Sequence, residues 1–244
     1  MVGGFRVAAG RFLDALACLA GRRCQLCDAV LADSRHFPLC PDCAGRLAPR
    51  RGGYCPECGI CYADPTAPVY PCLACRMSPP PWSALAFQGP YDGALKELVH
   101  RHKFGHEHGL GRLLAFLAGQ AWALRGLPRP DRIVPVPMLP ALVLRRGFNQ
   151  SAELARMLGS LMSRAPLLDG LRKVRDTRTQ SSLGRSARRS NVSGAFAASS
   201  GVRGLHILIV DDVMTTGATL AECTRACLAA GASRVDVFAL ARAL

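Results

Sequence analysis

Two neighbouring carboxylates and the threonine-rich turn that follows them are the residues of this chain best suited to chemistry. Asp211 and Asp212 come directly after the aliphatic residues 207–210, and residues 215–219 read Thr-Thr-Gly-Ala-Thr. Two adjacent carboxylates can accept hydrogen bonds from two vicinal hydroxyls, such as those of a ribose. Backbone N–H groups at the start of a helix attract phosphate, and the helix dipole adds to this attraction. Residues 211–219 are therefore predicted to form a cradle for a sugar phosphate.

This cradle requires a strand before it and a helix after it. Residues 207–210 are all aliphatic and three of them are β-branched, which is typical of a strand buried on both faces of a parallel sheet. A helix face is predicted behind the cradle at Leu220, Cys223, Cys227 and Leu228, and a last strand over 234–240. The alternative interpretation is an ordinary strand–turn–helix unit that carries its acids by chance.

The order of aliphatic run, Asp-Asp and Thr-Thr-Gly-Ala-Thr resembles the binding motif for 5-phosphoribosyl 1-diphosphate (PRPP) in type I phosphoribosyltransferases. This resemblance implies that Asp211 and Asp212 contact the ribose hydroxyls and that residues 215–219 wrap the 5′-phosphate. It also implies Mg²⁺ as the ion that accompanies PRPP. The residues implied to bind PRPP are Asp211, Asp212, Val213, Met214, Thr215, Thr216, Gly217, Ala218 and Thr219.

A second strand is predicted at residues 132–137, where an aliphatic run ends in proline and must turn. In the resembling transferases this place holds the pyrophosphate-binding loop, which here would contain Pro135 and Val136. Arg146 stands beside a glycine ahead of a helix pattern and predicts an anion site. The alternative for this segment is a charged turn in which Asn149 caps the helix. The apolar face of that helix is predicted at Leu154, Met157, Leu158 and Leu161.

The segment from Arg172 to Arg189 contains seven basic residues and a single acid, Asp176. It is polar and has no clear period, which fits a basic lid over a phosphorylated ligand. Arg178 and Arg188 would then help Arg146 to neutralise the departing pyrophosphate. A solvated loop without function is the alternative interpretation.

Four CxxC pairs dominate the N-terminal third of the chain. A CxxC turn lets two thiolates reach one ion, and a second pair completes a site of four thiolates. Two structural zinc ribbons are therefore predicted, with cross-braced pairing left open. A disulfide framework or a redox CxxC are the alternatives, and Cys61 could compete with a ligand. The predicted ligands are Cys24, Cys27, Cys40, Cys43, Cys55, Cys58, Cys72 and Cys75.

Two domains are predicted, with the proline-rich segment 77–82 as the boundary. Residues 1–78 would hold an N-terminal amphipathic helix, over 1–20, and the double zinc ribbon. Residues 83–244 would form an α/β domain, a parallel sheet flanked by helices that carries its ligand at the carboxyl ends of the strands.

The first helices of that domain are predicted directly after a short strand at 85–87. One begins at Asp92 as N-cap, with Leu95, Leu98 and Val99 inward and with Lys96 and Lys103 outward. A second helix is expected over 110–124. A metal site at the histidines of residues 100–108 is disfavoured, because basic residues alternate with them.

Composition limits the classes of function. The formal net charge is +14, which suits phosphorylated small molecules or nucleic acid. No apolar run is long enough for a membrane span, and Asp14 interrupts any signal-peptide core. A cytoplasmic protein with reduced cysteines is therefore expected.

The segments Arg146-Gly-Phe-Asn-Gln150 and Arg178-Thr-Gln-Ser-Ser-Leu183, with the cysteine-rich start of the chain, resemble the ComF family. These bacterial competence-related proteins join a zinc ribbon to a domain like the type I phosphoribosyltransferases. The resemblance implies PRPP binding, a role in DNA uptake, and transfer of a phosphoribosyl group to an acceptor that no motif identifies. No residue stands out as a general base. The competing hypotheses are an accessory protein that binds single-stranded DNA, and a scaffold whose ribbons dock a partner such as the competence machinery.

Overall fold

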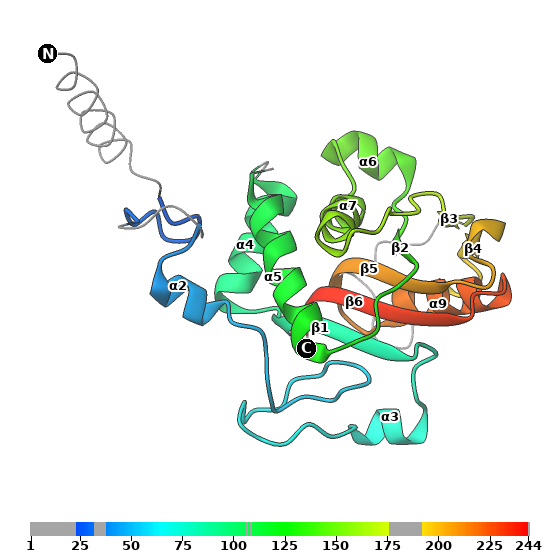
Figure 1. Cartoon of the computed structure of the whole chain (residues 1–244), viewed down its shortest axis with the longest axis horizontal. Helices are drawn as coiled ribbons and strands as arrows, with labels where there is room; N and C mark the ends of the chain where they lie inside the picture. Colours follow the sequence, from blue (N-terminus) through cyan, green and yellow to red (C-terminus); the bar gives the residue numbers. More distant parts are fainter. Residues whose placement is uncertain (1–22, 32–37, 106, 108, 176–191, 244) are drawn as a thin grey trace, which may run out of the picture. The chain divides into compact units, whose positions relative to one another are not determined.

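A computed structural model describes residues 23–31, 38–105, 107, 109–175 and 192–243 (Figure 1). Contacts between Cα atoms divide the chain into two compact units, Met1–Leu47 and Ala48–Leu244. The predicted helix at 1–20 and most of the predicted lid, including Arg178 and Arg188, lie outside the described residues. Among the described helices, none is long and apolar enough to span a bilayer.

Within residues 23–31 and 38–47, the described part of the first unit, there is one short helix, α2 (Pro41–Arg46). It begins with a proline at its first turn, where the missing N–H would have no helical partner. Cys24, Cys43 and Leu47 are buried in this unit. Its small core is therefore centred on cysteines.

The second unit is built on a parallel sheet of four strands in the order β1-β6-β5-β2. A separate antiparallel pair is formed by β3 and β4. The strands are β1 (Ala84–Pro90), β2 (Arg132–Pro135), β3 (Leu171–Lys173), β4 (Phe196–Ala198), β5 (His206–Met214) and β6 (Arg234–Arg242). The helices are α3 (Leu73–Met77), α4 (Gly93–Phe104), α5 (Leu110–Arg125), α6 (Pro140–Arg146), α7 (Gln150–Met162), α9 (Ala218–Ala229) and the 3-10 turn η2 (Ser200–Val202).

Helices pack on both faces of this sheet, as parallel strands require. Helices α5 and α7 contact β1, β2 and β5, whereas α9 packs on β5, β6 and the β3–β4 pair (Figure 1). Residues Ile207 to Val210 are completely buried, so both faces of β5 are covered. One hydrophobic cluster joins Ile207, Ile209 and α9 to Tyr54 and Trp82 from the cysteine-rich segment of the same unit. That segment is therefore part of the core that supports the sheet.

Most of the predicted elements are confirmed. The sheet is parallel and flanked by helices, α5 covers the helix expected at 110–124, and Asp92 is the N-cap residue of α4 although its side chain makes no capping bond. Two apolar assignments are wrong, because Leu161 and Leu228 are 58% and 40% exposed at the edges of their helices. Lys103 is also misassigned, since it points into the protein rather than outward.

The domain boundary predicted at residues 77–82 stays a prediction. The division between the two compact units falls between Leu47 and Ala48. The two groups of CxxC pairs therefore lie in different units, and the second group shares a unit with the sheet.

Candidate functional site

The two carboxylates lie near the C-terminal end of strand β5, at the carboxyl edge of the sheet. The strand continues through them to Met214, since Asp211 pairs with Ala239 and Met214 with Arg242 of β6. The acids were expected after the strand, and the extra length arises because β6 also extends to Arg242. Backbone N–H groups hold both carboxylates, from Asp212 to Asp211 Oδ1 at 3.0 Å and from Val213 to Asp212 Oδ1 at 2.7 Å. Their orientation is thereby set by their own strand.

Lys103 reaches the acid pair from the last turn of α4. Its Nζ lies 2.7 Å from Asp212 Oδ2, and the two side chains are only 19% and 16% exposed. Burial works against both charges, yet the ion pair prevails, so the pKa of Lys103 is raised and that of Asp212 is lowered. Asp212 is therefore an ionised carboxylate that already has a cationic partner.

Asp211 has a different environment. Ser151, in the first turn of α7, donates a hydrogen bond from Oγ to Asp211 Oδ1 at 2.9 Å. Burial raises the pKa of Asp211 to about 7, and the neighbouring Asp212 acts in the same direction. The two acids thus differ in charge near neutral pH, which gives the pair one strong and one weaker acceptor.

The predicted phosphate-binding turn leads directly into α9. Gly217 is the N-cap residue in a left-handed conformation with φ of 77°, which favours glycine. No side chain caps α9 at this position, and Thr216 Oγ1 accepts a hydrogen bond from the Ala218 N–H at 3.3 Å. The helix of twelve residues directs its positive end at this turn. An anion could therefore be held here by backbone N–H groups and threonine hydroxyls.

The segment around Arg146 differs from the predicted anion site. Asn149 caps α7 with its side-chain oxygen, which accepts from the N–H groups of Ser151 and Ala152. The same side chain donates from Nδ2 to the Val136 carbonyl at 3.2 Å, which ties α7 to the turn after β2. The helix N-terminus is thus occupied by its own cap, as the alternative interpretation predicted, and an anion site here would depend on Arg146.

Arg146 itself lies close to the acid pair. Its Nη1 donates to Gln150 Oε1 at 3.3 Å, and its Cζ lies 5.4 Å from the centre of the Phe104 ring. It also contributes to the lowered pKa of Asp212. Val136, whose N–H donates to the Val210 carbonyl at 2.9 Å, brings the turn after β2 to the same edge of the sheet. The structure therefore brings together Pro135, Val136, Arg146, Asp211, Asp212 and the turn at 215–219.

Sequence reasoning missed Lys103 and Ser151. A signal for Lys103 was available, because it follows the buried Val99 by four positions and so continues the inward face of α4. Ser151 stands at the second position of α7, where a polar residue is usually assigned to capping. Its contact with Asp211 joins distant parts of the chain and cannot be read from spacing.

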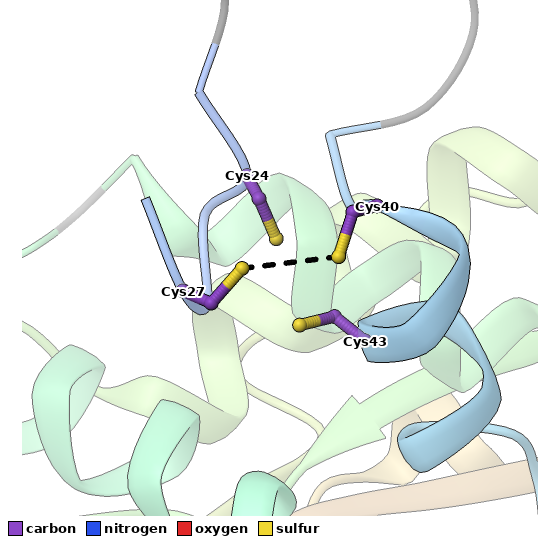
Figure 2. Close-up of side chains that lie close together, drawn as sticks. All are labelled: Cys24, Cys27, Cys40 and Cys43. Atoms are coloured by element: carbon purple, nitrogen blue, oxygen red, sulfur yellow. Dashed lines mark hydrogen bonds between the residues drawn. The ribbon is translucent and has the colours of Figure 1, made fainter. Parts of the chain in front are cut away.

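The eight predicted cysteine ligands form two groups of four, and within each group the sulfur atoms all lie within 4.8 Å of one another. Figure 2 shows the first group, in which the side chains of Cys24, Cys27, Cys40 and Cys43 point toward a common centre. The Sγ atoms of Cys27 and Cys40 are 3.8 Å apart, as are those of Cys58 and Cys72 in the second group. This spacing matches the edge of a tetrahedron with Zn–S bonds of about 2.3 Å.

The residues of each group follow one another along the chain, so the cross-braced pairing is wrong. All described cysteines are free thiols, which contradicts a disulfide framework in this part of the chain. Cys61 lies outside the second group and directs its Sγ to the Gly59 carbonyl at 3.6 Å. Four converging thiolates with no open position fit a structural zinc ion.

Comparisons with known proteins show which family domain and which proteins this chain is similar to. Residues 143–244 match the family model described as phosphoribosyl transferase domain. The chain is 40% identical to DNA utilization protein YhgH of Salmonella typhi over 91% of its own length and 97% of that protein. It is 30% identical to Competence protein F of Haemophilus influenzae, over 84% and 96% of the two chains. It is 32% identical to Competence protein ComFC of Streptococcus pneumoniae, over 62% of this chain and 65% of that protein.

Proposed function

Because this chain belongs to the ComF family, with a phosphoribosyltransferase-like domain, we propose that it binds PRPP at the carboxyl edge of its sheet and transfers the phosphoribosyl group to an acceptor. The observation that carries this proposal is that the groups suited to bind PRPP follow one another along the chain, from the end of β5 to the start of α9. The two carboxylates of Asp211 and Asp212 are followed by the start of α9, whose N-cap residue is a glycine, with Arg146 and Lys103 on the flank.

Each part of this edge suits one part of the ligand. Asp211 and Asp212 offer acceptors for the two ribose hydroxyls. The N–H groups and hydroxyls of residues 215–219 suit the 5′-phosphate. Arg146 and Lys103 are the cations that would stabilise the charge of the departing pyrophosphate as its bond to the anomeric carbon breaks.

Mg²⁺ would enter with the diphosphate, and the carboxylate oxygens of Asp211 and Asp212 are donors of the kind that this hard cation prefers. When bound, it would supply charge neutralisation for the diphosphate. The residues of the chain supply the rest, which is positioning of the ribose and exclusion of water from it. The acceptor is not identified by any residue at this edge.

Binding of PRPP with Mg²⁺ to the full-length protein tests the proposal. Calorimetry should detect binding, and the same ligand should raise the melting temperature because it binds only the folded state. The double variant Asp211→Asn with Asp212→Asn should lose both effects, whereas Asp169→Asn, an exposed carboxyl on a loop, should retain them. Absence of binding to the wild-type protein at millimolar ligand would reject the proposal.

A second candidate function is binding of single-stranded DNA without transfer chemistry. It is favoured by the names of the relatives, which refer to DNA utilization and competence, and by the net charge of +14. Such binding would weaken steeply with salt, because it would rest on contacts with phosphates. It would also survive the two Asp→Asn changes, which distinguishes it from the PRPP site.

A further inference from the structure

A buried arginine at the end of β6 links the second cysteine group to the cradle. Arg242 is only 6% exposed, and its Nε donates to the carbonyl of Cys58 at 2.7 Å. Its Nη1 donates to the carbonyl of Met214 at 3.3 Å and to that of Thr215. One guanidinium therefore connects a predicted metal ligand to the first residues of the phosphate-binding turn.

Trp82 makes a second link from the same CxxC turn. Its indole N–H donates to the carbonyl of Glu57 at 2.8 Å, next to Cys58 in the chain. The far side of its ring packs against Gly217, where an added Cβ would lie 3.2 Å from ring carbon Cη2. The two links thus reach two points of the turn, with Arg242 at Thr215 and Trp82 at Gly217.

The CxxC turn is also held tightly against the sheet. Gly59 has φ of 70°, and an added Cβ would lie 3.0 Å from Leu85 Cδ2 and 3.5 Å from Arg242 Cδ. The left-handed backbone favours glycine here, and an added side chain would press on Leu85 of β1. The Cys55–Cys58 turn is therefore fixed against the sheet by its contacts with Leu85 of β1 and with Arg242 of β6.

The bonds from Arg242 have a direct effect on the N–H groups of the cradle. The peptide unit is planar and trans, so the direction of a carbonyl sets the opposite direction of the N–H that follows it. With the Met214 and Thr215 carbonyls turned to Arg242, the N–H groups of Thr215 and Thr216 are turned away from it. The Met214 carbonyl also accepts a hydrogen bond from the Ala243 N–H at 2.9 Å, so it is the direction of the Thr216 N–H that depends on the arginine.

We propose that Arg242 and Trp82 are positioning residues for the cradle, and that the metal ion of the second cysteine group keeps their anchor in place. A bound ion would hold the four thiolates together, because structural zinc sites contribute directly to folding. Loss of the ion frees the Cys55–Cys58 turn and, through it, the turn at 215–219. This inference rests on the proposed function for the identity of the ligand, but the mechanical link does not depend on it.

Hydrogen exchange of the full-length protein, followed by mass spectrometry at the peptide spanning 214–220, tests the link without any ligand. Arg242→Met keeps the length of the side chain and removes its donors. Exchange of this peptide should accelerate by about tenfold or more, because bonds from a charged donor are lost. Cys58→Ser, which removes one ligand of the second group, should accelerate the same peptide.

Two matched controls separate this effect from a general loss of stability. Arg225→Met alters an arginine of α9 whose side chain is 61% exposed, and it should leave exchange at 214–220 unchanged. Cys27→Ser removes a ligand of the first cysteine group, which lies in the other compact unit, and should also leave it unchanged. Wild-type exchange at 214–220 in both Arg242→Met and Cys58→Ser would overturn the proposal.

A second variant decides the matter if Arg242→Met fails to fold. Trp82→Phe retains an aromatic ring and loses the N–H that binds Glu57, so it should still accelerate exchange at 214–220, and unchanged exchange would overturn the proposal. Binding of PRPP with Mg²⁺ is measured separately. If the wild type binds, Arg242→Met should bind about tenfold more weakly while it retains both zinc ions. If the wild-type protein does not bind PRPP, the proposed function fails. The role of Arg242 and Trp82 is then tested by hydrogen exchange at 214–220 alone.

Discussion

The ammonium group of Lys103 lies 2.7 Å from the carboxylate of Asp212, one of the two adjacent acids near the end of β5. This pair joins the end of α4 to the end of β5 and is largely shielded from water. The sugar phosphate proposed above would therefore have to share Asp212 with Lys103 or displace the lysine. In the structure as described, Lys103 keeps Asp212 ionised.

Removal of the lysine charge should destabilise the protein. Lys103→Met leaves Asp212 without its cation beside a second carboxyl group, so we expect the free energy of unfolding to fall by about 1–3 kcal/mol. Urea denaturation near pH 8 would measure it. Lys96→Met alters an exposed lysine on the same helix and should have almost no effect. Equal losses in the two variants would show that the ion pair contributes nothing.

The two acids should respond to neutralisation with opposite signs. The pKa of Asp211 is raised to about 7 by burial, so the folded state binds a proton more tightly than the unfolded state. Ionisation of Asp211 therefore costs stability as the pH rises through this value. Asp211→Asn should raise the melting temperature relative to wild type near pH 8, and the difference should shrink as the pH falls below 7.

Asp212→Asn should lower the stability instead. The pKa of Asp212 is lowered, so its ionised form stabilises the folded state at neutral pH, and this contribution is lost only in acid. We expect a loss of about 1 kcal/mol, since Lys103 can turn in part to Asp211. Thermal unfolding of the two variants across a series of pH values would compare them directly, and a shift of the same sign in both would contradict the different environments.

Gly217 should tolerate alanine less well than another glycine with a similar backbone. Both Gly217, with φ of 77°, and Gly204, with φ of 72°, lie in the left-handed region, but only Gly217 faces a neighbour, the Trp82 ring. Gly204→Ala should cost about 1 kcal/mol from the backbone alone, whereas Gly217→Ala should cost more because the ring must move. Denaturation curves of the two variants measure the difference, and equal costs would show that the ring yields freely.

Metal analysis should find two zinc ions in each chain. Cys43→Ser and Cys75→Ser should each lose one ion, and Cys61→Ser should retain both, because its sulfur lies outside the groups. Only Cys75→Ser should lower the melting temperature of the sheet-containing unit, to which the second group belongs. Retention of both ions in Cys75→Ser would show that Cys61 replaces the missing ligand.

The sequence was most informative where the chemistry is local. The CxxC pairs and the run from Asp211 to Thr219 lie close along the chain, so type and spacing predicted the two groups of cysteines and the strand and helix on either side of the turn. Contacts between distant segments were missed, such as Lys103 with Asp212, Ser151 with Asp211 and Arg242 with Cys58. Spacing cannot reveal these pairs, because the fold alone decides which side chains meet. The ending of β5 was misplaced for the same reason, since it depends on its partner β6.

The position of β6 has a consequence for how the chain acquires its structure during synthesis. This strand lies between β1 and β5, although it follows every other strand along the chain. The sheet cannot close until residues 234–242 have left the ribosome, and the first strand must wait unpaired for a partner from the far end of the chain. Such distant parallel pairings form slowly and expose apolar edges in the meantime. We therefore expect newly made chains to depend on chaperones, and chains that stop short of β6 to aggregate.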